Sequence, residues 1–200
     1  MQLNEFTTQL NSTTEELQLL RSQKNNITGD TARIRQEILQ AVGATEEEIP
    51  FVGELIKVRT EASVWEPVIE QLLHSFALRL IVPEAYYQQV NQYVRQHDLR
   101  GRIVYQRFAP KEVAPVIMQP NDEQTLWHKL DFKKSPYRDW LESEISTRYD
   151  YLCVENLESF RLAIKAVTRE GLMKNGNRHE KDDRPKVKNN RSRYVLGWDN

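Results

Sequence analysis

Residues 77–83 read Ala-Leu-Arg-Leu-Ile-Val-Pro, a nearly continuous apolar run that is closed by a proline. Such a run is typical of a strand buried on both faces, because a half-exposed strand alternates with polar residues. It lies between two segments, 65–73 and 86–97, whose apolar residues recur at helical spacing. Residues 51–58 and 103–108 are the predicted outer strands. This order of strands and helices predicts an α+β fold in which helices pack on a mixed sheet with some parallel pairing.

The C-terminal half continues the alternation of helices and strands. Residues 109–122 contain three prolines, which predicts an extended connection. Ser135 followed by Pro136 is typical of a helix start, and residues 150–154 predict another strand. Asn156 is a candidate N-cap for a helix that runs through Leu157, Phe160, Ile164 and Ala166. The apolar residues 194–196 close the predicted domain.

Residues 1–42 carry a different pattern. Alternate steps of three and four from Leu3 meet twelve positions as far as Ala41, and nine of them are apolar. A repeat of this period predicts one helix of a coiled coil; the alternative is a globular amphipathic helix, whose apolar face would be wider. Gly29 and the pair Asn25-Asn26 weaken the helix locally. We therefore expect an arm segment over 1–42 and one domain over 43–200. No later segment repeats this heptad seam, the line of apolar positions that would face a partner helix. We therefore expect the partner helix in a part of a longer chain.

Bulk composition indicates no nucleic-acid or membrane partner. The chain has 28 basic and 29 acidic residues, a net charge of -1. The single cysteine, Cys153, lies in an apolar run and cannot form an intrachain disulfide, which fits a reducing compartment and a buried thiol. No stretch reaches the ~18 apolar residues of a membrane span, and no signal peptide is recognisable. The expected location is the cytoplasm.

The sequence contains no motif that carries known chemistry. None of its seven glycines forms a phosphate-binding loop, and one cysteine excludes a cysteine-rich zinc site. His179 and Glu180 with Asp182 and Asp183 could be read as a metal cluster, but neighbouring loop positions do not converge on one point. We therefore expect no catalytic residue, no metal and no cofactor, and predict that the chain is not an enzyme.

One segment does concentrate charge. Residues 171–193 contain eight basic and three acidic residues, a net charge of plus five. Basic side chains spaced along a loop can neutralise phosphates without reading base sequence. The alternative is a solvated loop that contributes only solubility, and the absence of interleaved aromatic residues favours neither. The candidate DNA-binding residues are Lys174, Arg178, Lys181, Arg184, Lys186, Lys188, Arg191 and Arg193.

Two stretches resemble the hinge domain of SMC proteins, the family of condensin and cohesin. The first runs from Gly53 through Trp65-Glu66-Pro67-Val68-Ile69 and the apolar strand at 80–82 to Gly101-Arg102-Ile103-Val104-Tyr105. The second runs from 151–154 to Val167-Thr168-Arg169-Glu170-Gly171 and the turn that ends at Gly176. The chain departs from the family pattern at His74, which replaces the usual glycine, and in the insert 109–149.

The departures themselves carry a narrower resemblance. Residues 50–55, Trp140-Leu141-Glu142 and the endings 178–184 and 194–200 look most like the MukB-like SMC subunit of Wadjet plasmid-defence systems. The resemblance covers about residues 50–200, and the heptads before it fit the arm that such a hinge would cap.

The resemblance implies a non-catalytic hinge that homodimerises at the tip of a coiled coil, within an ATPase that acts on DNA. Kleisin, KITE and nuclease subunits would join through parts of the full-length protein that this chain lacks. The candidate interface residues are Val167, Thr168, Gly171 and Gly176. Two alternatives remain open: a stand-alone DNA-binding module and a metal-dependent nuclease domain.

Overall fold

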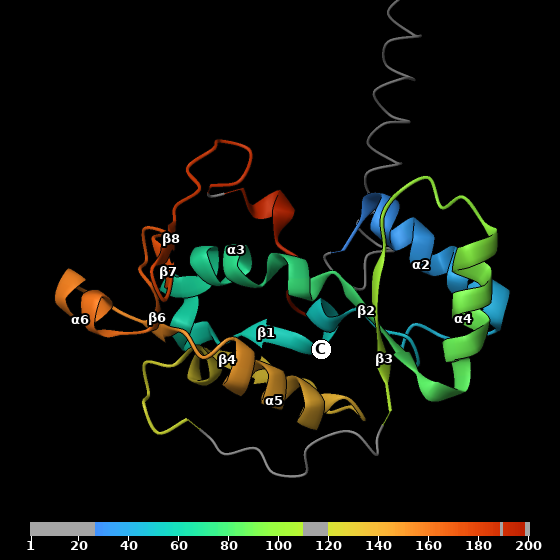
Figure 1. Cartoon of the computed structure of the whole chain (residues 1–200), viewed down its shortest axis with the longest axis horizontal. Coiled ribbons are helices and arrows are strands. Elements are labelled where there is room, and N and C mark those ends of the chain that lie inside the picture. Colours follow the sequence, from blue (N-terminus) through green and yellow to red (C-terminus); the bar gives the residue numbers. More distant parts are fainter. Residues whose placement is uncertain (1–26, 110–119, 189, 199–200) are drawn as a thin grey trace, which may run out of the picture.

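The computed structural model describes residues 27–109, 120–188 and 190–198 (Figure 1). Its α-helices are α2 (Gly29–Val42), α3 (Glu66–Ala77), α4 (Glu84–Gln96), α5 (Arg138–Arg148) and α6 (Leu157–Leu162). Its strands are β1 (Ile56–Val58), β2 (Arg79–Pro83), β3 (Val104–Phe108), β4 (Leu130–Phe132), β5 (Leu152–Cys153), β6 (Lys165–Val167), β7 (Met173–Asn175) and β8 (Arg178–Glu180). Short 3-10 helices are η1 (Val52–Leu55), η2 (Thr60–Trp65), η4 (Leu126–Lys129) and η5 (Arg191–Arg193).

The apolar run quoted above is strand β2, and its predicted burial is confirmed. Leu80, Ile81 and Val82 are completely inaccessible to solvent. After β2 the chain turns directly into α4 and returns as β3, which pairs in parallel with β2 from Arg79–Val104 to Pro83–Phe108. Helices α2 and α4 lie beside each other against this pair (Figure 1). The predicted parallel pairing is therefore present.

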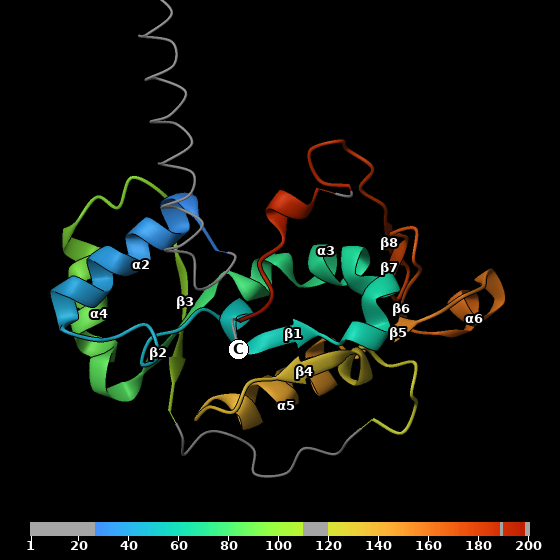
Figure 2. The same cartoon turned by 180° about the vertical axis from the view of Figure 1, so that it is seen from behind.

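The remaining strands form two further small sheets. Strands β1 and β4 pair antiparallel, and the other sheet has the order β5-β6-β7-β8. Within it β5 and β6 are parallel, whereas β6-β7 and β7-β8 are antiparallel. Figure 2 shows α3 crossing the middle of the molecule, with the β2-β3 pair towards one end and the four-stranded sheet towards the other. The fold is a mixed α+β arrangement, as the sequence predicts.

The described part of the insert 109–149 supplies structure to the core. Residues 120–148 provide η4, β4 and α5, and β4 completes the small sheet with β1. Helix α5 buries Leu141 and Ile145 completely, as its apolar spacing predicts. The hydroxyl oxygen of Ser135 accepts a bond from the Tyr137 amide at 3.2 Å, although the helix itself starts at Arg138. The insert is thus an integral part of the domain.

Two predicted elements are wrong in detail. The expected strand over 51–58 begins only at Ile56, because Val52–Leu55 forms a 3-10 turn in which the Glu54 carboxylate accepts a bond from the Phe51 amide at 2.8 Å. The expected helix through Ala166 ends at Leu162, since Ala163 adopts an extended conformation (φ -78°, ψ 149°). Residues 165–167 then form β6, so the apolar residues beyond Ala163 belong to a strand and its approach.

Helix α2 packs on the domain. Ile34 and Ile38, two positions of the predicted heptad seam, are fully buried in the main core, and α2 lies against α4. Between them on the helix, the guanidinium of Arg35 is 2% exposed and forms a bidentate ion pair with Glu54. The other predicted seam positions as far as Lys24 lie outside the described residues. The arm over 1–42 therefore stays a prediction, while its last turns already form part of the domain surface and core.

One large hydrophobic core joins both ends of the molecule. It includes residues of every α-helix from α2 to α5 and of strands β1 to β6, and the Cys153 thiol lies inside it. Burial raises the pKa of this thiol to about 12, which makes it inert at neutral pH. No helix in the described part of the chain combines the length and the apolar character needed to cross a lipid bilayer.

Candidate functional site

Three large apolar side chains lie exposed at the α6 end of the molecule. Leu157 and Leu162 are each 70% exposed and Ile164 is 76% exposed. Together they form what we call the apolar tip, which Figure 1 shows projecting beyond the four-stranded sheet. Isolated exposed leucines are ordinary on protein surfaces, but three large exposed apolar residues within eight positions make this end of the molecule a candidate contact surface.

The local sequence explains why these side chains are not buried. The Asn156 side chain accepts a bond from the Ser159 amide at 2.8 Å and starts α6, as predicted. The ammonium of Lys174 donates to the carbonyl oxygens of Phe160 and Arg161, at 3.0 and 2.8 Å, and holds the end of the helix. Within this helix of six residues, Phe160 is the side chain that is buried.

A small satellite core supports the apolar tip. It consists of Val154, Phe160 and Ala166, and it is separate from the main core. Of the four apolar residues on the predicted helix, Phe160 and Ala166 are buried, whereas Leu157 and Ile164 are exposed. The reason is that the helix ends before a second turn could cover them.

The predicted interface residues lie close to this end, but in two different environments. Val167 is fully buried in β6, between β5 and β7, and Thr168 is 8% exposed. The Thr168 carbonyl and hydroxyl oxygens accept bonds from the amides of Gly171 and Leu172, so these residues form a tight turn. Their place in an interface stays a prediction, and it would involve the turn and not the buried side chains.

Gly176 has a clearer connection with the apolar tip. Its amide donates to the carbonyl oxygen of Ile164 at 2.8 Å, so the β7-β8 hairpin is fixed beside the exposed isoleucine. Gly171 and Gly176 have φ values of 96° and 61°, and a side chain at Gly176 would meet open space. Backbone geometry therefore explains both glycines within one chain, since other residues rarely adopt positive φ.

Strands β8 and β3, towards opposite ends of the molecule, each have an edge that pairs with no other strand among the described residues. In the four-stranded sheet, β8 is the last strand and all three of its side chains, Arg178, His179 and Glu180, are exposed. At the other end of the molecule β3 pairs only with β2. The outer edge of β5 is occupied, because Cys153 donates to the Gln124 carbonyl oxygen at 2.8 Å. Open edges are places where a second chain can add backbone hydrogen bonds.

The basic segment is folded and internally paired. Asp182 holds Arg184 at 2.6 Å, Asp183 holds Lys188 at 3.2 Å, and Lys181 also pairs with Asp183. The hydrogen bonds from Arg184 lower the pKa of Asp182 to about 2. Further pairs join Arg178 to Glu180 and Arg191 to Glu66. Five of the eight candidate DNA-binding cations therefore already face a carboxylate, although the net positive charge remains.

The other three candidates differ. Lys174 is committed to the end of α6, as described above. Lys186 is exposed and Arg193 half-buried, and neither lies within ion-pair distance of a carboxylate among the described residues. In the same ranges, no group of three or more histidine, cysteine or acidic residues is placed to hold a metal ion, and this includes His179 and its acidic neighbours.

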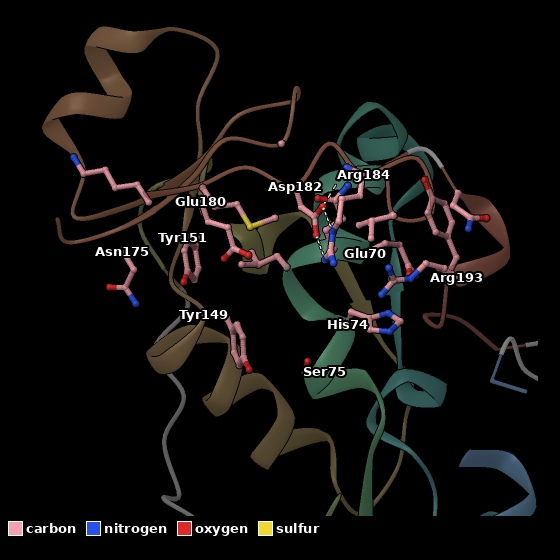
Figure 3. A pocket seen from close by; sticks show the side chains of 18 of the residues that line it. Glu70, His74, Ser75, Tyr149, Tyr151, Asn175, Glu180, Asp182, Arg184 and Arg193 are labelled. Carbon is pink, nitrogen blue, oxygen red and sulfur yellow. Dashed lines mark hydrogen bonds and ion pairs between the residues drawn. The ribbon is translucent and has the colours of Figure 1, made fainter. Parts of the chain in front are cut away.

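A cavity of about 370 Å³ lies between α3 and the basic segment (Figure 3). One wall is the face of α3 that carries Glu70, His74 and Ser75, and the opposite wall includes Tyr149 and Tyr151. The basic segment closes it with charged side chains, among them Arg178, Asp182, Arg184 and Arg193. Burial, followed by the nearby Arg193, lowers the pKa of His74, which keeps this imidazole neutral at pH 7. The charges of both signs give the cavity no clear preference for an anion or a cation.

Comparison with known proteins assigns the fold. No family model matches the chain, and none of the curated proteins does. Among solved structures, the Smc hinge domain of Pyrococcus furiosus with an extended coiled coil superposes with a TM-score of 0.59 at 20% identity, over 93% of this chain and 66% of that one. An asymmetric dimer of the Geobacillus stearothermophilus SMC hinge domain gives 0.59 at 14% identity, over 93% and 78%. The fold is that of an SMC hinge domain.

The same hinge fold recurs in a eukaryotic complex. The Smc5/6 hinge domain of S. pombe superposes with a TM-score of 0.52 at 13% identity, over 97% of this chain and 79% of that one. Identities this low establish the architecture alone. The chain spans slightly less than two thirds of the Pyrococcus chain.

Three features of this chain were not predicted from the sequence. The exposure of the apolar tip had one weak signal, because Leu157 and Leu162 are five residues apart and cannot share the inner face of a helix. The pairing of Lys188 with Asp183 depends on the turn at residues 185–188, which joins positions five residues apart. The burial of Glu70 had no local signal, because its partners lie about 125 residues away.

Proposed function

We propose that this chain is the hinge module of an SMC-like ATPase and that two copies join through the apolar tip. The observation that carries the proposal is the exposure of three large apolar side chains at the α6 end of a domain with the hinge fold. A two-fold pair presents the same surface from each copy, so one patch of three residues places six large side chains in one interface. The module would have no catalytic turnover of its own.

The free energy and the area that the apolar tip can contribute indicate that it needs neighbouring surfaces to form a stable interface. Complete burial of a leucine or isoleucine side chain contributes about 1.5–3 kcal/mol, whereas association costs about 4–15 kcal/mol. A specific interface also buries more than about 1,000 Å², which three side chains per copy do not provide. The adjacent β7-β8 hairpin and the open edge of β8 are the surfaces that would complete the contact, and Gly176 lies within them.

Sedimentation of the full chain against a variant in the apolar tip tests this proposal. The variant Leu157→Ser, Leu162→Ser, Ile164→Ser should lower the association constant by at least about tenfold, the equivalent of 1.4 kcal/mol, because it removes the apolar surface. A control variant, Val104→Ser, changes an exposed apolar residue on β3, at the other end of the molecule (Figure 1). Equal association constants for all three proteins would refute a contact through the apolar tip.

DNA binding by the basic segment is a second, weaker part of the proposal. Its net charge of plus five and the exposure of Lys186, Lys188 and Arg191 support it. The ion pairs within the segment argue for a modest affinity, since each cation that contacts a phosphate first has to share or leave its carboxylate. Binding of this kind is independent of base sequence and falls steeply with salt.

The finer assignment rests on the sequence alone. The resemblance of residues 50–55, 140–142 and 194–200 to the MukB-like subunit supports a role in Wadjet plasmid defence. Kleisin, KITE and nuclease subunits would then bind elsewhere on the full-length protein. The coiled-coil arm over 1–42 belongs to the same proposal, with α2 as the point where the arm meets the domain.

A further inference from the structure

A buried carboxylate holds the C-terminal segment 194–198 on helix α3. Glu70 is 4% exposed, and its oxygens accept two bonds from the Val195 amide, at 3.1 and 3.0 Å, and one from the Leu196 amide, at 2.9 Å. These are contacts between one side chain and the backbone. They therefore fix the path of the segment independently of the side chains at 195 and 196.

The same segment is seated on η1 from its other side. The Gly197 amide donates to the Gly53 carbonyl oxygen at 2.9 Å, and the Trp198 ring lies 5.3 Å from the ammonium of Lys57. A Cβ atom at Gly53 would overlap the carbonyl oxygen of Val195, which explains the glycine there. The segment thus passes through a narrow slot between α3 and η1, and Glu70 is the charged group on the α3 wall.

We propose that residues 194–198 form a proton-linked strap, whose closure onto α3 is coupled to uptake of a proton by the Glu70 carboxyl group. When the strap is closed, Glu70 is removed from water and faces two amides. When the strap is open, the same carboxyl group is hydrated. An ionised carboxylate loses more hydration than a neutral acid on burial, so closure of the strap favours the protonated form.

The electrostatic surroundings of Glu70 support this coupling. Burial raises the pKa of Glu70 to about 7; the Leu196 and Val195 amides oppose the rise, and the Glu66 charge adds to it. His74 on the same helix is neutral at pH 7, because burial and then Arg193 lower its pKa. Arg193 and Tyr194 also face this region, and Arg191 forms an ion pair with Glu66. The Asp182–Arg184 ion pair lies across the cavity (Figure 3).

Two of these neighbours titrate far outside the range around neutral pH. Asp182 has a pKa of about 2, and burial raises the pKa of Tyr194 above its usual 10. The cavity beside α3 gives Glu70 a route for proton exchange, because Glu70 is one of its lining residues. Glu70 is the titratable group in direct contact with the strap amides, whereas His74, whose pKa lies below its ordinary 6.5, makes no hydrogen bond to them. The Glu70→Gln variant separates the two groups.

The direction of the effect follows from the two pKa values. Glu70 has a pKa of about 7 in the closed form and would return towards its ordinary value of 4.5 when the strap opens. The closed form binds the proton more tightly, so closure is strongest in acid and weakens as the pH rises towards about 7. The full change corresponds to about two orders of magnitude in the opening equilibrium.

Amide hydrogen exchange in the full chain tests the proposal. Protection factors of the Val195, Leu196 and Gly197 amides, corrected for the intrinsic pH dependence of exchange, should fall about 100-fold between about pH 5 and pH 8. In Glu70→Gln, which keeps the shape and removes the charge, protection should not vary with pH. The control Glu158→Gln, at an exposed position on α6, should behave like the unchanged chain.

A titration of the unchanged chain covers the case in which Glu70→Gln does not fold. The carboxyl carbon of Glu70, followed by NMR, should titrate with a midpoint well above the ordinary 4.5. A midpoint near 4.5 would overturn the proposal, as would pH-independent protection in the unchanged chain or an unchanged pH slope in Glu70→Gln.

Discussion

The β2-α4-β3 unit and the α6 end of this molecule are built from similar residues with opposite results. Leu80 and Ile81 in β2 are completely buried, whereas Leu162 and Ile164 at the apolar tip are at least 70% exposed. Strand β2 is enclosed by η1, α4 and β3, while α6 rests on a satellite core of three buried residues. Apolar residues that do not stabilise the single chain are available for contact with another one, and this places the candidate interface at the α6 end.

The same contrast holds for charged residues. The Arg35–Glu54 pair is buried and joins α2 to η1, while the pair Arg169–Glu155 near the α6 end is about half exposed at 2.6 Å. Burial removes the screening that makes surface pairs weak, and it also makes the loss of one partner costly. Removing one partner of the buried pair should therefore lower the stability of the domain strongly, whereas removing one partner of the exposed pair should change it little.

The largest expected effect comes from removing one partner of the buried pair. Glu54→Ala leaves the buried Arg35 guanidinium with only the more exposed and more distant Glu46 carboxylate, at 3.6 Å, and also removes the acceptor for the Phe51 amide. We expect a loss of about 3–5 kcal/mol in the free energy of unfolding, and a fall of about 10 °C in Tm. Urea and thermal denaturation would measure it.

The matched control is Glu155→Ala, which breaks the exposed pair with Arg169. It should change the free energy of unfolding by less than about 1 kcal/mol. Comparable losses in the two variants would contradict the contrast between the two regions.

A pair of identical substitutions compares the apolar residues directly. Leu80→Ala leaves a cavity in a fully buried strand and should cost about 2–5 kcal/mol. Leu162→Ala removes the same atoms from the apolar tip, where they pack against little else, and should cost less than about 0.5 kcal/mol in the single chain. Urea denaturation at low protein concentration, where association does not contribute, would separate the two. A loss above about 2 kcal/mol for Leu162→Ala would mean that the apolar tip is structural.

DNA binding should show the smallest effect. Changing Arg178, Lys186, Lys188 and Arg191 to serine should weaken binding to all sequences alike and reduce the salt dependence by about one for each phosphate that is no longer neutralised. Fluorescence anisotropy over a range of salt concentrations would measure both. The control changes four exposed cations elsewhere, Arg95, Arg102, Lys133 and Lys134. If both quadruple variants bind like the unchanged chain, the segment is only a solvated loop.

The sequence predicts the enclosed region better than the exposed one. The unbroken apolar run at 80–82 and the helical spacing in α3 and α4 identify buried elements, because enclosure on all sides leaves a clear pattern. The heptads across Ile34 and Ile38 are less decisive, since periods of 3.5 and 3.6 residues hardly diverge over the 14 residues of α2.

The candidate site depends on contacts that no local pattern records. In the sequence Glu70 is an ordinary polar position of a helix, and its burial depends on residues 195 and 196, which are about 125 residues away. Leu157 and Ile164 are seven residues apart and predict a shared helical face, but the chain turns extended at Ala163 and exposes both. The charges of the basic segment are visible in the sequence, whereas the pairing of Lys188 with Asp183 also requires the turn at 185–188.

Hydrogen exchange of the full chain at low and at high protein concentration tests the central claim most directly, because it detects self-association and locates it at once. If two copies join through the apolar tip, protection should rise with concentration in residues 157–164 and in the β7-β8 hairpin, and stay unchanged in β2 and α4. The triple serine variant of the apolar tip should lose this rise. Concentration-independent protection at the α6 end, or a rise confined to α2, would contradict the account.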